Sequence, residues 1–454
     1  MIWFVGAGCY HEDMITLAAI KVLKIADCVC YDHLVNKELL GYCQNCELIN
    51  VGKIGHGSSF KQEDINRLLV EKSRIYHHVV RLKGGDPYLF GRGSEEMLYC
   101  LEHGIDCQYI PGISSLGGLG YAGIALTHRG LASGFSVHTL HYQDGQDHLD
   151  YDLIAKDNNT HIFFMGASKI KQFVNNCLKH GKDPNTSIAL VKKASYPDQK
   201  VMVSTLDKIL TYDISEYTNP LLIVLGDVCK LQQDLDNTKR LRAYGKKVLL
   251  LYVDEGFNSD MLLLENGITV SQKQVAKVLY ECHQDVDLDE YEYLVFVSKH
   301  AYDGFINYLY QHNLDIRVLN NKKIACIGQK TKEYIQSKGI MVDIVSDSSK
   351  NLFIDSHKVL LVDGNDHDLK DHLSVYRLFP LAYEIDDDYD VIGVTCPMAI
   401  ESLNSKNINK DIALFSFGFK SYDKAVSLGF KNIIKCPSSK DKMLEMIIEY
   451  LVKG

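Results

Sequence analysis

The chain has 454 residues, of which 46% are hydrophobic and 24% charged, a composition typical of globular domains with ample core material. Its formal net charge of −9 argues against nucleic acid as the main partner, and no apolar run reaches the roughly 18 residues of a membrane span. The N-terminal residues MIWFVGAG enter an apolar strand directly, so we expect neither a signal peptide nor a membrane role.

Cysteine usage points to a reducing compartment. The 13 cysteines are odd in number and show no spacing framework, which predicts free thiols and a cytoplasmic location. Cys43 and Cys46 form a CxxC pair, but the chain has no second such pair. We therefore interpret the pair as structural and predict no metal site.

Strands and helices alternate in the first 110 residues. We expect strands at 2–5, 28–31, 47–51 and 79–82, and helices at 15–23 and 62–73. This alternation predicts a mostly parallel sheet. Asp32, Lys53 and Asp86 each follow the end of a strand, and a parallel sheet would bring them to one edge.

The most informative stretch is 79–96, with the sequence VVRLKGGDPYLFGRGSEE. The glycine pair at 84–85 carries no Cβ, so the backbone there can lie directly against a ligand. A tight surface turn would explain a lone glycine pair. Asp86, Arg92 and Glu95 crowd the same loop, however, and this favours a binding site.

Further along the chain, three features indicate more domains. A glycine-rich strand-to-helix junction at 107–118 opens a second α/β region, which extends to about residue 228. Residues 230–246 are highly charged and lack a strand pattern, so we place the main linker there. The strand-to-helix patterns that begin at 293 and 323 recur at 390 and 411, which predicts two similar lobes rather than a solenoid.

Ordered motifs in the first half resemble uroporphyrinogen-III C-methyltransferases, members of the tetrapyrrole methylase family. The motifs are VGAG at 5–8, YDHLV at 31–35, VGK at 51–53, RLKGGDPYLFGRGSEE at 81–96, PGIS at 111–114, LTHRGLAS at 126–133, FFMG at 163–166 and PDQ at 197–199. The resemblance implies a fold of two α/β subdomains and a homodimer formed through this domain. It also implies S-adenosylmethionine as methyl donor and methylation of two pyrrole carbons of uroporphyrinogen III to give precorrin-2.

The second half resembles uroporphyrinogen-III synthase, through VFVSKHAYDGF at 295–305, ACIGQKTKEYIQSKG at 325–339 and their echo around Thr395 and Gly418. That enzyme is bilobed, uses no cofactor, and closes hydroxymethylbilane into uroporphyrinogen III. Together the resemblances predict a methylase domain at 1–232 (subdomains 1–112 and 113–232), a linker at 233–246 and a synthase domain at 247–454. The expected lobes of the synthase domain are 276–382 and 247–275 with 383–454.

The methylase resemblance also implies roles for individual residues. Asp32 would accept a proton and Lys53 would donate one; the alternatives are a strand-end cap and a solvated loop lysine. The cofactor would contact Gly84, Gly85, Asp86, Leu89, Ser114, Ser115, Met165 and Ala194. Arg92, oriented by Glu95, and Arg129 would clamp substrate carboxylates through their fork-shaped donors. Met165 as plain core and Arg129 as a surface pair are the structural alternatives.

For the second half, the resemblance implies substrate contacts at strand-to-helix loops. These residues are Ser298, Thr331, Thr395 and Ser421, with Gly328 and Gly418 offering amides at helix starts. Tyr383 aligns with a tyrosine proposed as an acid in the family. Ordinary helix capping explains the hydroxyl residues equally well.

The chain departs from the family patterns at several positions. Cys9 replaces a proline, Leu140 and Ala194 replace glycines, and Asp254 stands where Thr-Arg is common. Because backbone contacts survive side-chain changes better than side-chain contacts do, we expect effects on affinity and efficiency rather than on reaction type.

The leading hypothesis is a bifunctional enzyme of tetrapyrrole biosynthesis, which serves sirohaem or cobalamin formation. Two alternatives are a methylase with a decayed synthase half and a non-catalytic tetrapyrrole-binding protein. A dehydrogenase is disfavoured, because GAGCYH lacks the third glycine of the dinucleotide fingerprint.

Overall fold

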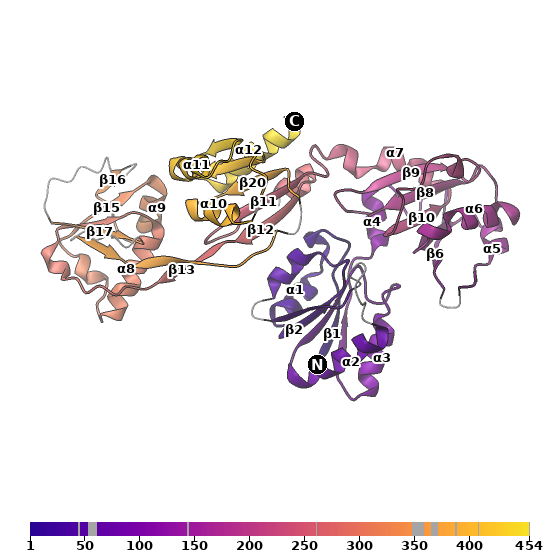
Figure 1. Ribbon diagram of the computed structural model, residues 1–454, viewed down its shortest axis with the longest axis horizontal. Helices are drawn as coiled ribbons and strands as arrows, with labels where there is room; N and C mark the ends of the chain where they lie inside the picture. Colours follow the sequence, from indigo (N-terminus) through magenta and orange to yellow (C-terminus); the bar gives the residue numbers. More distant parts are fainter. Residues whose placement is uncertain are drawn as a thin grey trace. The chain divides into compact units, whose positions relative to one another are not determined.

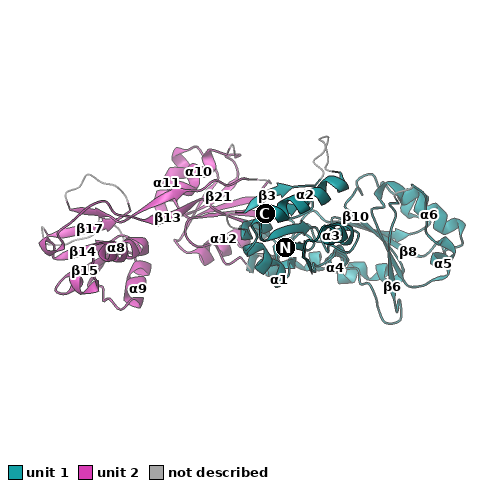
Figure 2. Cartoon of the chain, turned by 90° about the horizontal axis from the view of Figure 1, so that it is seen from below, with its two compact units in different colours: residues 1–247, 260–271, 450–454 teal, residues 248–259, 272–449 magenta. Residues whose placement is uncertain are grey.

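The computed structural model describes residues 1–43, 46–52, 61–142, 145–259, 261–346, 358–364, 371–385, 388–406 and 408–453. The chain divides into two compact units (Figure 2). One comprises 1–247, 260–271 and 450–454, and the other comprises 248–259 and 272–449. Each described helix is too short or too polar to span the hydrocarbon core of a bilayer.

The first sheet is parallel throughout, as its alternating pattern predicts. Its strand order is β3-β2-β4-β1-β5, and each neighbouring pair runs in the same direction. The strands are β1 (Ile2–Gly6), β2 (Cys28–Tyr31), β3 (Glu47–Asn50), β4 (Val79–Lys83) and β5 (Cys107–Ile110). The helices are α1 (Leu17–Lys24), α2 (Gln62–Ile75) and α3 (Gly93–Glu102).

Helices cover both faces of this sheet. Phe4 belongs to the core that includes Leu69 of α2 and Cys100 of α3. The adjacent Val5 points to the opposite face and packs in the core that includes Leu23 of α1. A parallel sheet covered on both faces needs apolar residues at consecutive positions, and the apolar runs of its strands supply them.

The second sheet, with order β6-β7-β10-β8-β9, is mixed. Only β6 and β7 pair in parallel, whereas β7–β10, β10–β8 and β8–β9 are antiparallel. The strands are β6 (Phe135–Thr139), β7 (Thr160–Phe164), β8 (Ser187–Lys192), β9 (Lys200–Thr205) and β10 (Leu221–Leu225). The helices are α4 (Ser115–Tyr121), α5 (Tyr151–Lys156) and α6 (Ile170–Lys179).

The stretch 230–246, where the sequence places the linker, packs against the preceding domain. It contains the short helix α7 (Gln232–Leu235) and a 3-10 turn at Asn237–Arg240. Gln232 is buried, and its Nε2 donates to the carbonyl oxygen of Ala122 at 3.0 Å. The domain boundaries at 232 and 247 remain predictions.

The second half of the chain repeats one strand-to-helix pattern around two sheets. The first sheet has the order β12-β11-β20-β21-β22 and the second β16-β15-β14-β17-β18. The first contains β11 (Lys247–Tyr252), β12 (Thr269–Gln274), β20 (Val391–Val394), β21 (Ala413–Phe417) and β22 (Ile433–Cys436), with α10 (Pro397–Asn404), α11 (Gly418–Ser427) and α12 (Lys440–Lys453).

The second of these sheets is parallel throughout. It contains β14 (Tyr293–Phe296), β15 (Lys323–Ile327), β16 (Ile344–Ser346), β17 (Val359–Asp363) and β18 (His372–Ser374), with α8 (Lys299–Gln311) and α9 (Gln329–Ser337). An antiparallel ribbon of β13 (Ala276–Tyr280) and β19 (Tyr376–Pro380) runs along the chain connections between the two sheets (Figure 1).

Three glycines meet where β1, β4 and β5 end. A Cβ added to Gly112 would lie 2.1 Å from the carbonyl oxygen of Gly85 and 2.7 Å from Cα of Gly6. Both neighbours are backbone atoms and cannot swing away. Gly112 therefore allows the chain leaving β5 to pass directly over the other two loops.

We expect Gly112→Ala to destabilise the fold by ~3 kcal/mol, because the methyl group must displace packed backbone. Gly120→Ala is the matched control: Gly120 is exposed in α4, and a Cβ added there would have nothing within 4 Å. Alanine there should stabilise by up to about 1 kcal/mol. Denaturant unfolding of both variants measures the difference, and equal effects would contradict the close approach.

Candidate functional site

Four loops meet at the carboxyl edge of the parallel sheet. Gly8 follows β1, Asp32 directly follows β2, the Gly84–Asp86 loop follows β4, and Ser114 follows β5. The backbone N–H of Asp32 donates to Leu82 O at 3.2 Å, and the Gly85 and Gly8 backbones exchange two hydrogen bonds. The edge of an open parallel sheet is where such folds bind ligands. Lys53, the expected proton donor, lies outside the described residues.

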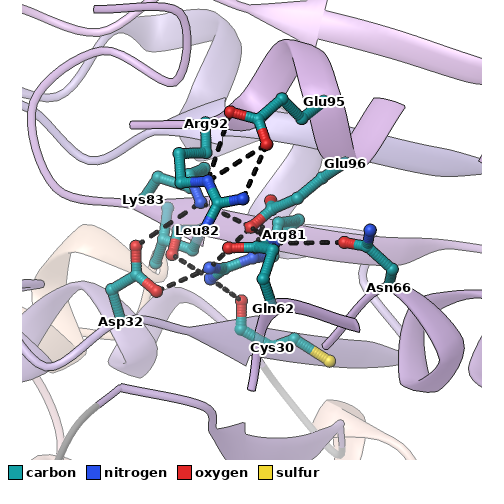
Figure 3. A network of polar contacts seen from close by, with 10 residues as sticks. All are labelled: Cys30, Asp32, Gln62, Asn66, Arg81, Leu82, Lys83, Arg92, Glu95 and Glu96. Carbon is teal, nitrogen blue, oxygen red and sulfur yellow. Dashed lines mark hydrogen bonds and ion pairs between the residues drawn. The ribbon is translucent and has the colours of Figure 1, made fainter. Parts of the chain in front are cut away.

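A buried ion cluster lies beneath this edge (Figure 3). Nη2 of Arg81 lies 2.6 Å from Oδ1 of Asp32, and Nε of Arg81 lies 3.1 Å from Oε2 of Glu96. Nζ of Lys83 is 2.9 Å from Oε1 of Glu96 and 3.7 Å from Oδ2 of Asp32. Two cations therefore meet two carboxylates.

Burial differs sharply within the cluster. The side chains of Arg81, Lys83 and Glu96 are 2%, 4% and 0% exposed, whereas that of Asp32 is 30% exposed. Burial tends to lower the pKa of Arg81, but Asp32 and Glu96 outweigh it and raise that pKa. Burial, followed by the charge of Arg81, lowers the pKa of Lys83. Asp32 is thus the member of this cluster that a ligand can reach.

The glycine loop is braced by Asp86. Its Oδ2 accepts from the hydroxyl of Tyr109 at 2.5 Å and from the Gly112 N–H at 3.1 Å, and its Oδ1 accepts from the Tyr88 N–H at 2.8 Å. The carboxylate is therefore engaged within the protein. A cofactor contact at Asp86 would have to use its backbone or share these oxygens.

The start of α4 faces the glycine loop. A Cβ on Gly85 would lie 3.8 Å from Cα of Ser114 and 4.0 Å from N of Ser115. Gly85 has φ +67°, so a side chain there is also strained. Ser114 caps the helix by accepting from the Leu116 N–H at 3.2 Å. Glycine keeps open the space in front of these two serines.

Cys9 and Ala194, the two residues that depart from the methylase family pattern near the expected cofactor site, lie close together. Oγ of Ser195, the residue after Ala194, donates to the carbonyl oxygen of Cys9 at 2.5 Å. Ala194 is buried, and its Cβ would lie 3.3 Å from a Cβ placed on Gly118 of α4. The extra methyl group of Ala194 is accommodated because residue 118 is glycine.

Of the remaining methylase candidates, Arg92, Arg129 and Met165 lie on exposed loops, and Glu95 lies in the first turn of α3. Arg92 has φ +59°, and its Nη2 lies 2.7 Å from Oε2 of Glu95, an ion pair that agrees with the proposed orienting role. Arg129 and Met165 are exposed, with Met165 at φ +55°. The rings of Phe90 and Phe164, the neighbours of Leu89 and Met165, lie 4.9 Å apart, so these two segments pack together.

In the second half, strand ends and helix starts also converge. Ser298 caps α8, where its Oγ accepts from the Ala301 N–H at 3.1 Å and lies 3.3 Å from the hydroxyl of Tyr376. Thr395 Oγ1 donates to Leu251 O at 3.4 Å. Nζ of Lys330 donates to the Ser438 carbonyl at 3.1 Å, and a Cβ on Gly418 would lie 3.6 Å from Ser438 Oγ.

Three expectations for the synthase half need correction. Thr331 and Ser421 lie within the first turns of α9 and α11 and are buried, so they are not loop residues. The amide of Gly328 is not free, because it donates to Ser346 O at 2.8 Å.

Tyr383 also differs from its expected setting. It is buried in the apolar core that includes Leu249, Val394 and Ala399. Burial raises the pKa of its hydroxyl. A side chain enclosed by this core is poorly placed to donate a proton to a large substrate.

Asp254, which departs from the synthase family pattern, is surrounded by basic side chains. Its Oδ2 lies 2.6 Å from Nζ of Lys299 and 3.4 Å from Nε2 of His300, and its Oδ1 lies 3.9 Å from Nζ of Lys440. Hydrogen bonding from His300, and then from Lys299, outweighs burial and lowers the pKa of Asp254. The carboxylate is therefore held in its charged form.

Sequence reasoning missed Arg81, Lys83 and Glu96. One signal was present: Arg81 and Lys83 are two cations at alternate positions of an otherwise apolar strand, which directs both to one face. A cation in a central strand requires a buried partner. The identity of that partner, Glu96, depends on how α3 returns across the sheet.

We expect Glu96→Ala to destabilise the first unit by about 3–5 kcal/mol, because it leaves two buried cations without their shared carboxylate. Glu95→Ala is the matched control. Glu95 pairs with Arg92 on the exposed side of the same helix turn, and such a pair contributes only about 0–1 kcal/mol. Thermal and denaturant unfolding compare them, and losses of similar size would refute the special role of Glu96.

Comparisons with known proteins match both halves of the chain. The family model of Tetrapyrrole (Corrin/Porphyrin) Methylases matches residues 1–210, and that of Uroporphyrinogen-III synthase HemD matches 267–374. The chain is 31% identical to the porphyrin biosynthesis protein HemD of Ruminiclostridium josui, covering 78% of this chain and 72% of that protein.

Two further proteins are similar. The uroporphyrinogen-III C-methyltransferase of Bacillus subtilis is 31% identical over 78% of this chain and 75% of its own length. A solved uroporphyrin-III C-methyl transferase from Thermus thermophilus, complexed with S-adenyl homocysteine, is 35% identical with a TM-score of 0.45, over 50% of this chain and 98% of that chain. The chain therefore belongs to the tetrapyrrole methylases and carries a uroporphyrinogen-III synthase HemD domain in its second half.

Proposed function

We propose that the first half methylates two pyrrole carbons of uroporphyrinogen III to give precorrin-2, and that the second half closes hydroxymethylbilane into uroporphyrinogen III. The observation that carries the methylase proposal is a half-buried carboxylate, Asp32, beside a glycine-floored loop at a sheet edge. Family membership supports both activities.

The residues at this edge fit S-adenosylmethionine. Gly84 and Gly85 present backbone without side chains, and Ser114 and Ser115 begin α4 directly opposite Gly85. When bound, S-adenosylmethionine supplies a sulfonium methyl group that a carbon nucleophile can take. Leu89, Met165 and Ala194 would complete the walls of this site.

Asp32 has the chemistry required after methyl transfer. The methylated pyrrole carries an extra positive charge and must lose one proton to become neutral. A carboxylate oxygen within reach accepts that proton and stabilises the charge before transfer. Arg92 and Arg129 are exposed and suited to the carboxylates of a polyanionic substrate.

We also propose that the protein acts as a homodimer through its methylase domain and works in the cytoplasm. Family resemblance supports the first point. The second is supported by the odd cysteine count, which matches a reducing environment.

Asp32→Asn should slow methylation by ~10²–10⁴-fold, because asparagine cannot accept the proton. Binding of S-adenosylmethionine should persist, since Asn keeps the shape of the side chain. Isothermal titration and initial rates with uroporphyrinogen III measure both quantities. If binding disappears together with activity, Asp32 serves the cofactor site instead.

The full chain given hydroxymethylbilane should form uroporphyrinogen III without S-adenosylmethionine and precorrin-2 with it. Isomer analysis of the products separates the two halves, because spontaneous closure gives the type I isomer. The Asp32→Asn chain is the control and should still produce the type III isomer. A yield of type I alone would remove the synthase activity from the proposal.

A further inference from the structure

Strand β4 carries buried charged residues at positions where apolar residues would suffice for folding. β4 is the third strand of the five-stranded order, with β2 on one side and β1 on the other. Its residues Arg81 and Lys83 are nevertheless a guanidinium and an ammonium that are almost fully enclosed. Replacing buried ion pairs by apolar residues is often neutral or stabilising, so stability alone is a poor reason for this cluster.

Every donor direction of Arg81 is fixed. Nε and Nη2 lie 3.1 and 3.3 Å from the two oxygens of Glu96, and Nη1 donates to the carbonyls of Cys30 and Leu82, both at 3.4 Å. Glu96 is fixed in turn by Lys83 and by Gln62 Nε2, each at 2.9 Å (Figure 3). The guanidinium thus has a single orientation, which is set by two backbone carbonyls of the sheet and by the Glu96 carboxylate of α3.

The Nη2 group of Arg81, which also contacts Glu96, is directed toward the Asp32 carboxylate. Nη2 of Arg81 lies 2.6 Å from Oδ1, and Nζ of Lys83 lies on the side of Oδ2 at 3.7 Å. The two oxygens of Asp32 are therefore held by different cations. Asp32 is also the cluster member with the most exposed side chain, at 30%.

We propose that Arg81 is a positioning residue, which holds the Asp32 carboxylate in one rotamer for proton acceptance while Glu96 holds Arg81. This inference rests on the proposed methylase function and deepens it. Arg81 itself gains and loses no proton. Its contribution is geometric, because a displacement of about 1 Å in a reacting group can cost on the order of a hundredfold in rate.

A double-mutant cycle tests the proposal in the full chain. Arg81→Lys keeps the positive charge next to Glu96 but loses the fork that also reaches Asp32. In the wild-type background we expect kcat for methylation to fall by about 10–100-fold. The dissociation constant of S-adenosylmethionine should change by less than about twofold.

The decisive measurement is the same substitution in the Asp32→Asn background. If Arg81 acts through Asp32, it should change kcat there by less than about twofold. An equal loss in both backgrounds would show a merely structural role and overturn the proposal. If Asp32→Asn alone leaves kcat unchanged, the assigned role of Asp32 fails, which is a separate result.

Two further variants guard against misfolding. Glu96→Gln keeps the shape of the side chain and weakens the hold on Arg81. If Arg81→Lys does not fold, the effects of Glu96→Gln and Asp32→Asn on kcat should be non-additive in the same way.

Lys182→Met is the control: Lys182 is a buried cation that donates to the carbonyls of Ile154 and Asp157, away from the sheet edge. It should lower stability but leave kcat of the folded protein unchanged in both backgrounds. Loss of kcat in this control would overturn the proposal, since any buried charge would then have the same effect.

Discussion

Neutralising two cations inside a parallel sheet is the constraint on which the first half of the protein depends. Arg81 and Lys83 lie on the same face of β4, where water cannot reach them. Removing such groups from water costs several kcal/mol per ion unless carboxylates and carbonyls replace the water. Asp32 and Glu96 are those carboxylates, and they come from the end of β2 and the first turn of α3.

This requirement also explains the shape of the loop between β4 and α3. Glu96 must return across the strand that carries its partners, so the chain has to reverse between Lys83, where β4 ends, and Gly93, where α3 begins. Arg92 takes a left-handed conformation, and the N–H of Gly93 donates to Pro87 O at 2.9 Å. A Cβ on Gly93 would lie 2.6 Å from that same oxygen. The turn that forms the candidate binding loop is thus the turn that closes the ion cluster.

The sequence allowed most of the first sheet and its edge to be predicted, because the signals are local. Strands rich in apolar residues end near Tyr31 and Leu82, glycines mark the turns, and parallel pairing then places Asp32 and Gly84–Asp86 side by side. The ion cluster was not predictable in the same way. It depends on which strand becomes central and on the path of α3, and neither follows from spacing along the chain.

The mixed second sheet shows another limit. β6 and β9 form its two edges, and most of their residues are only partly buried, so neither has the apolar run of a central strand. The alternation of apolar and polar residues along a strand also does not reveal the strand's direction, because the same residues face the core whether the neighbouring strands are parallel or antiparallel. In the second half, Thr331 and Ser421 were misplaced because α9 begins at Gln329 and α11 at Gly418, so each helix starts before the hydroxyl residue that was expected in the preceding loop.

A cation that is paired with an internal carboxylate can orient that carboxylate but contributes little net attraction for an anionic substrate. The substrate proposed for both halves is a polyanion, whereas the chain as a whole is acidic. The buried cations of the first half are matched by Asp32 and Glu96 and add no net attraction, so an exposed arginine such as Arg129 has to supply it. In the second half, Asp254 occupies Lys299 in the same way. An anion that approached Lys299 would have to compete with Asp254 for this cation. In both halves, therefore, an internal carboxylate holds a cation and reduces the net charge that this cation presents to an anion.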